Sequence, residues 1–202
     1  LDPKKQGRTM CEVYGAYGWA EGLKLMKWLT DHMLVRGVNY FVPHAFTQKD
    51  PDPDCPPHMY AGGKNPQYRY YKHLNHYMNR ISHLISGGRH VATAAVVYHA
   101  EAEWSGEAML FQKPVKQLMQ HQIDCEIVPI DILLDAASVK NSLLHVHKET
   151  FECLIVPYAE ALPAAMIRRL AEFAEQGLAV RFVGGLPIRA SEGSDAAAEL
   201  AE

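Results

Sequence analysis

Two features that would each indicate a class of protein are missing from this sequence. No stretch approaches the roughly 18–20 consecutive apolar residues that a membrane-spanning helix requires. Positive charge is not in excess, because 20 Lys and Arg stand against 23 Asp and Glu, giving a formal net charge of −3. Proteins that bind nucleic acid through a positive electrostatic field carry a clear excess of Lys and Arg. We therefore expect neither a membrane nor a nucleic acid as a partner.

Motifs for common cofactors are missing as well. The sequence contains no Gly-x-Gly-x-x-Gly dinucleotide fingerprint and no Walker A phosphate loop. Its four cysteines lie far apart, with no Cys-x-x-Cys pair and no disulfide-dense pattern. Cys55 and His58 have the spacing of a metal-ligand pair, but no second pair matches them. We expect no cofactor and no metal, and the reduced thiols favour a cytoplasmic location.

What is present is the composition of a packed globular protein. Among the 202 residues, 48 % are hydrophobic and 21 % are charged, which suits one or two domains. Gly87-Gly88 marks a shift in composition, so we expect domains at 1–88 and 89–190, with a polar tail over 191–202. Because the chain opens at Leu1 with a polar run, we also expect it to be a piece of a longer protein.

Strands and helices alternate along both predicted domains. In the first, we expect strands over 10–14 and 38–42, and helices over 20–35 and 65–86, with a long Pro- and Gly-rich loop before the second helix. In the second, we expect strands over 90–98, 125–130, 151–156 and 178–183, and helices over 112–122 and 163–176, with a short helix within 131–146. Short connections between alternating elements predict an α/β protein with a parallel, doubly wound sheet.

Glu12 is the best single candidate for chemistry. It comes at the end of the first predicted strand, where α/β folds place functional groups, and Tyr14 and Trp19 follow it closely. A carboxylate beside flat aromatic surfaces is an environment suited to a sugar. His44 ends the next strand, so the two side chains could share one site. In the alternative interpretation, Glu12 caps the following helix or pairs with an arginine, and His44 is structural.

The order of these elements carries a family resemblance. A strand ending in Glu12, a helix, the strand segment Gly37–His44, a long loop and a helix precede a unit that opens with Val96–His99 and Trp104. This layout resembles the end of a glycoside hydrolase (β/α)8 barrel joined to the middle domain of family 42-type β-galactosidases. It is also similar to large bacterial hydrolases grouped with the α-L-rhamnosidases. The resemblance implies an incomplete barrel remnant over 1–88 and a flavodoxin-like accessory domain over 89–190.

The resemblance also implies an activity. Residues 10–14 and 38–42 would be barrel strands seven and eight, and Glu12 would be the nucleophile of a two-carboxylate glycosidase, with Tyr14, Trp19 and His44 binding the carbohydrate. Its acid/base partner would lie on strand four, outside this chain, so the fragment by itself would be inactive. The accessory domain would mediate contacts in a homo-oligomer. The sugar, the linkage and the choice between retention and inversion stay open.

A second hypothesis involves no catalysis. Residues 89–190 would then form a Rossmann-like assembly or ligand-binding module, with the first 88 residues packed on it as an extension. This hypothesis accounts for the lack of a complete catalytic set. For the first hypothesis, strands 10–14 and 38–42 would have uncovered edges and apolar faces, which we expect to be hidden by dimerisation or rearrangement.

Overall fold

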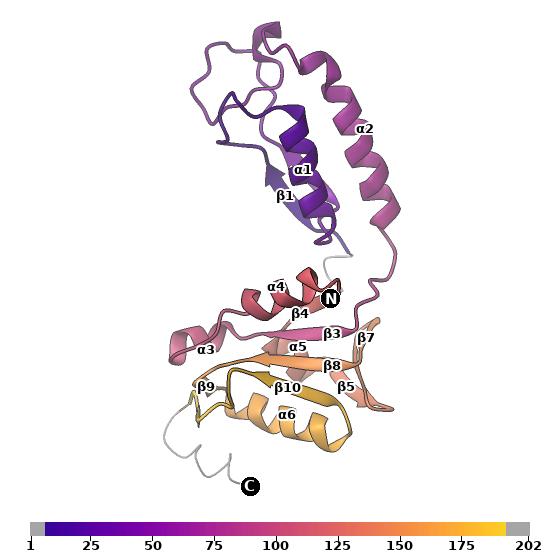
Figure 1. Cartoon of the computed structure of the whole chain (residues 1–202), viewed down its shortest axis with the longest axis vertical. Helices are drawn as coiled ribbons and strands as arrows, with labels where there is room; N and C mark the ends of the chain where they lie inside the picture. Colours follow the sequence, from indigo (N-terminus) through magenta and orange to yellow (C-terminus); the bar gives the residue numbers. More distant parts are fainter. Residues whose placement is uncertain (1–6, 193–202) are drawn as a thin grey trace. The chain divides into compact units, whose positions relative to one another are not determined.

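The computed structural model describes residues 7–192, and the chain divides between Gly88 and Arg89 into two compact units (Figure 1). We call these the N-terminal unit and the C-terminal unit. Each has its own cluster of buried apolar side chains. Most of the predicted tail, residues 193–202, lies outside the described residues, and the tail stays a prediction.

The N-terminal unit is a β–α–β arrangement followed by a long loop and a helix. Strand β1 (Met10–Val13) runs parallel to β2 (Tyr40–Pro43), and helix α1 (Leu23–Leu34) connects them. In this register Glu12 pairs with Val42 and Val13 with Pro43, so both strands end at the same edge of the sheet. The loop contains the short 3-10 helix η2 (Ala61–Gly63) and leads into α2 (Tyr68–Ile85).

The core of the N-terminal unit lies between its two helices and its sheet. Its buried members are Val13, Tyr14, Met26, Leu29, Met59, Leu74 and Met78. Within it, the Thr30 hydroxyl donates to the Met26 carbonyl at 2.7 Å. Because that bond uses the only hydroxyl proton of Thr30, the neighbouring Tyr14 hydroxyl donates to Thr30 Oγ1. This buried pair fixes Tyr14 against α1.

Apolar side chains on both strands of this sheet are exposed. Met10, Tyr40 and Val42 have exposed fractions of 60 %, 58 % and 42 %. Large apolar side chains on a sheet face usually pack against another layer or another chain. We expected dimerisation or rearrangement to hide these faces. Within residues 7–192 no rearrangement covers the three side chains, and dimerisation stays a prediction.

The C-terminal unit is built on a four-stranded parallel sheet. Its strands are β3 (Ala94–Tyr98), β4 (Cys125–Pro129), β8 (Cys153–Pro157) and β10 (Ala179–Val183), in the order β10-β8-β3-β4. The helices are α3 (Ala100–Ser105), α4 (Gln112–Gln120), α5 (Ile130–Asp135) and α6 (Ala164–Glu175). Strands β9 (Ala161–Leu162) and β11 (Arg189–Ala190) form a short parallel pair. The prediction of an α/β chain with parallel sheets is confirmed.

A three-stranded antiparallel sheet was missed by the sequence analysis. The predicted short helix exists as α5, but it is followed by β5 (Ala137–Lys140), β6 (Leu143–Val146) and β7 (Glu149–Phe151). Asn141 and Ser142 join β5 to β6 with φ angles of 52° and 61°. Two consecutive residues in the left-handed region are what a two-residue hairpin turn requires, and asparagine tolerates that region well. The consecutive residues Asn141 and Ser142 are therefore the sequence feature from which this hairpin could have been predicted.

None of the helices within residues 7–192 is both long enough and apolar enough to cross a bilayer.

Candidate functional site

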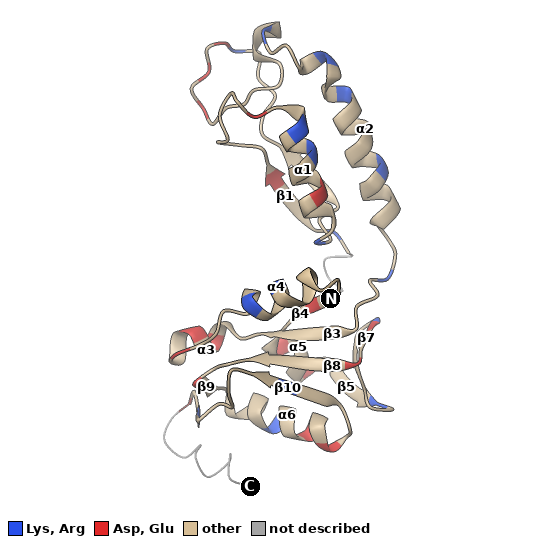
Figure 2. Ribbon diagram, in the orientation of Figure 1, with Lys and Arg blue, Asp and Glu red and all other residues tan. Residues whose placement is uncertain are grey.

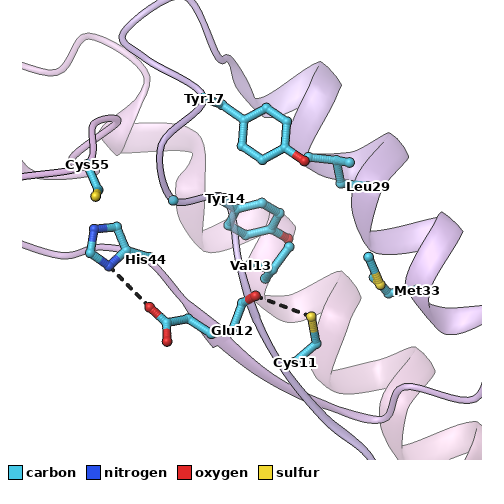
Figure 3. A pocket seen from close by; sticks show the side chains of 10 residues that line it. Cys11, Glu12, Val13, Tyr14, Tyr17, Leu29, Met33, His44 and Cys55 are labelled. Carbon is cyan, nitrogen blue, oxygen red and sulfur yellow. Dashed lines mark hydrogen bonds and ion pairs between the residues drawn. The ribbon is translucent and has the colours of Figure 1, made fainter. Parts of the chain in front are cut away.

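Glu12 and His44 meet at the common edge of β1 and β2. His44 Nδ1 lies 3.4 Å from Glu12 Oε1 (Figure 3), a distance that makes an ion pair when the imidazole is protonated. The Glu12 side chain is 67 % exposed, and Figure 2 marks this end of β1 as acidic. Both residues line a pocket of about 430 Å³. The carboxylate is thus held by a neighbour and is accessible to a ligand.

The connection between β1 and α1 is shaped by residues in the left-handed backbone region. Tyr14 and Ala16 have φ angles of 81° and 67°, a conformation that costs a non-glycine residue roughly 1–2 kcal/mol. Long-range hydrogen bonds hold it, since the Ala16 amide donates to the Cys55 carbonyl and the Gly18 amide to the Pro56 carbonyl. Strained backbone maintained in this way is common at functional sites. Here it places the chain against the long loop, beside Glu12.

Gly15 sets the position of the His44 ring. A Cβ atom at Gly15 would lie 3.1–3.3 Å from three atoms of the His44 side chain, closer than ordinary contact. We expect Gly15→Ala to displace the imidazole by a few tenths of an ångström and so to shift the NMR signals of the His44 ring. Proton NMR of the histidine rings measures this effect.

Gly18→Ala is the matched control for that substitution. Gly18 has a φ angle of 84°, and no atom lies within 4 Å of a Cβ built there. Its replacement should therefore cost about 1 kcal/mol of stability through backbone strain and leave the His44 signals unchanged. If both variants shift the His44 signals equally, or if neither does, the placement of His44 by Gly15 is wrong.

Tyr14 lines the same pocket, but its hydroxyl is engaged elsewhere. The ring is almost fully buried, and the hydroxyl contacts Thr30 Oγ1 and, at 3.2 Å, Met78 Sδ. Burial raises the pKa of Tyr14 to about 12. Tyr14 therefore supports the wall of the pocket and offers no free hydroxyl group to a ligand. Tyr17, which lines the pocket and is 55 % exposed, presents a more accessible phenol (Figure 3).

Trp19 lies beside a histidine that the sequence analysis did not select. Its ring meets the His58 ring edge-on with centroids 5.6 Å apart, and His58 in turn lies 6.2 Å from His44. His58 is 1 % exposed, and neither ring nitrogen has a hydrogen-bond partner within the described part of the chain. The spacing of Cys55 and His58 had drawn attention only as a weak metal pair. In the described residues, no three acidic, His or Cys side chains are arranged to hold a metal ion.

The family follows from a match over nearly the whole chain. The profile of glycoside hydrolase family 106, described as α-L-rhamnosidase, matches residues 8–202. The chain belongs to this family. A search of curated proteins gives no significant match. The glycoside hydrolase resemblance that the sequence analysis inferred from Glu12, Gly37–His44 and the order of elements is confirmed.

Two solved structures show the same fold. The rhamnosidase from Novosphingobium sp. PP1Y aligns with 92 % of this chain at a TM-score of 0.62 and 18 % identity. Gan42B, a GH42 β-galactosidase, aligns with 90 % of it at a TM-score of 0.61 and 13 % identity. The chain spans 18 % of the length of the rhamnosidase and 27 % of that of the β-galactosidase.

Proposed function

We propose that this chain contributes a catalytic carboxylate to a glycoside hydrolase that cleaves terminal α-L-rhamnosides. One observation carries the proposal: Glu12 stands exposed at the carboxyl end of β1, 3.4 Å from a histidine at the end of the adjacent parallel strand. In (β/α)8 barrels the active site lies at that edge of the strands. The family match supplies the sugar, since the matching profile is described as α-L-rhamnosidase.

The N-terminal unit would be the end of such a barrel. Strands β1 and β2 take the places of strands seven and eight, and six further strands from outside this chain cover the exposed faces of Met10, Tyr40 and Val42. Two strands cannot close a barrel, so the isolated chain lacks an active site and shows no hydrolysis. The C-terminal unit, whose parallel strands run in the order β10-β8-β3-β4, is a flavodoxin-like accessory domain. Trp104 on α3 is 84 % exposed and gives the C-terminal unit an apolar surface for contacts between subunits.

Glu12 would act opposite the leaving group. Glycosidases use two carboxyl groups, one of which protonates the glycosidic oxygen while the other attacks the anomeric carbon or activates a water molecule. In a retaining enzyme, where the two lie about 5–5.5 Å apart, Glu12 is the nucleophile; at about 6.5–9.5 Å it is the general base of an inverting enzyme. His44 holds the carboxylate in place, and the acid comes from another strand of the barrel.

A panel of aryl glycosides tests this function. We expect the full-length protein to hydrolyse an aryl α-L-rhamnoside with a kcat/KM roughly 100-fold above that for an aryl β-D-galactoside, because pocket contacts discriminate between sugars by about that factor. NMR of the first-formed anomer then assigns retention or inversion. Preference for the galactoside would contradict the proposed sugar. Hydrolysis of none of the panel would favour the non-catalytic assembly module.

A further inference from the structure

A second pocket, of about 270 Å³, lies in the same N-terminal unit and plays no part in the site at Glu12. Trp19 and Glu21 reach it from the connection between β1 and α1, and Asp50 and Lys64 from the loop before α2. Figure 2 shows acidic and basic positions along that loop. The pocket therefore combines an aromatic ring, two carboxyl groups and an ammonium group.

Glu21 has a buried carboxyl group in this pocket that lacks hydrogen-bond partners in the described part of the chain. The residue is 5 % exposed, and neither carboxyl oxygen has a hydrogen-bond partner within residues 7–192. Buried polar groups are nearly always paired, since leaving one unpaired costs several kcal/mol. Lys64 does not serve Glu21, because its Nζ atom lies 2.7 Å from Asp50 Oδ2. A ligand in the pocket would supply the partners that the described residues do not give Glu21.

The remaining lining selects a neutral molecule with many hydroxyl groups. An anion would be repelled by the Glu21 carboxyl group, and Asp50 and Lys64 already neutralise each other, so a neutral hydroxyl donor serves Glu21 without adding charge. Gln67 also lines the pocket, where its Oε1 accepts from the Leu23 amide at 2.8 Å and so fixes the amide group. Trp19, 52 % exposed, offers an indole for the apolar face of a pyranose ring. A sugar provides hydroxyl donors, hydroxyl acceptors and such a face.

We propose that the pocket at Trp19 and Glu21 binds a second neutral sugar residue, next to the one that is cleaved at Glu12. The buried His58 ring lies between the two pockets, with its centroid 5.6 Å from that of Trp19 and 6.2 Å from that of His44. The inference rests on the proposed function for the identity of the first sugar. The substrate is accordingly a rhamnose-terminated oligosaccharide, with two hydroxyls of its second residue bonded to Glu21.

Calorimetry on the full-length protein carrying Glu12→Gln tests this without hydrolysis. The probes are methyl α-L-rhamnoside and the disaccharide α-L-rhamnosyl-(1→6)-D-glucose. We expect Trp19→Ala and Glu21→Gln, each added to that background, to weaken disaccharide binding about tenfold or more and monosaccharide binding by much less. Trp28→Ala is the matched control, because Trp28 is 59 % exposed on α1 and lines neither pocket. It should bind both probes as the background protein does.

The outcomes separate this site from the proposed activity. Equal losses of both probes, or no loss of the disaccharide in either variant, overturn the second subsite even where the protein hydrolyses rhamnosides. A selective loss of the disaccharide in a protein that hydrolyses nothing supports the subsite and counts against the catalytic role of Glu12. Because Trp19 is half exposed, its truncation leaves the core in place and keeps the test valid if Glu21→Gln fails to fold.

Discussion

Replacing Glu12 by glutamine in the full-length protein should lower kcat on aryl glycosides by on the order of 10³-fold or more. Glutamine has nearly the same shape and still reaches His44, but it carries no charge and cannot attack carbon or take a proton from water. The side chain is 67 % exposed, so the free energy of unfolding should change by no more than about 0.5 kcal/mol. Kinetics together with thermal unfolding therefore separate lost chemistry from lost structure.

The role of Glu12 within the reaction follows from a second replacement. If Glu12 is the nucleophile, azide should restore activity to Glu12→Ala by occupying the vacated space and attacking the anomeric carbon, giving a glycosyl azide. The control is Glu175→Gln, which changes an exposed carboxylate outside both pockets and should be fully active. Full activity in Glu12→Gln would remove the carboxylate from the mechanism and favour the assembly-module hypothesis.

The meeting of Glu12 and His44 could be predicted because it depends on strand direction. An uninterrupted apolar run before His44 indicated a strand of a parallel sheet, and parallel neighbours end at the same edge, although Tyr40 and Val42 are exposed here and not buried as that pattern suggests. The structure pairs Glu12 with Val42 in the ladder, and His44 follows Val42 by two residues. Periodicity likewise located α1 and α6 to within a few residues. The local sequence pattern was sufficient to predict those elements whose hydrogen bonds run along one helix or one strand ladder.

The surroundings of these two residues could not be predicted in the same way. Trp19 was expected beside Glu12, yet it lines a different pocket, because hydrogen bonds from Ala16 and Gly18 to a loop about 40 residues away turn the chain. The burial of Glu21 results from that same loop. No local pattern marks a carboxyl group that is enclosed by a distant segment, so neither the second pocket nor His58 was predicted.

The free energy of unfolding of Glu21→Gln, relative to that of the parent, should be higher at pH 8 than at pH 5. Burial raises the pKa of Glu21 from 4.5 to about 7, so the folded chain retains a proton that the unfolded chain releases between these values. The free energy of unfolding of the parent therefore falls as pH rises through this window, by on the order of 1–3 kcal/mol, and the loss is complete above about pH 7. Glutamine does not titrate, and the variant should lack this fall.

The informative quantity is the difference in unfolding free energy between variant and parent, measured by denaturant titration without sugar at pH 5 and pH 8. A buried amide without partners also costs free energy, but that cost is the same at both pH values and cancels in the comparison. Asp54→Asn is the control in the same unit, because Asp54 is exposed and its carboxyl group has no comparable burial cost. A difference for Glu21→Gln that is equal at the two pH values would mean that water or a protein group solvates Glu21, and would remove the argument that its carboxyl group awaits a ligand.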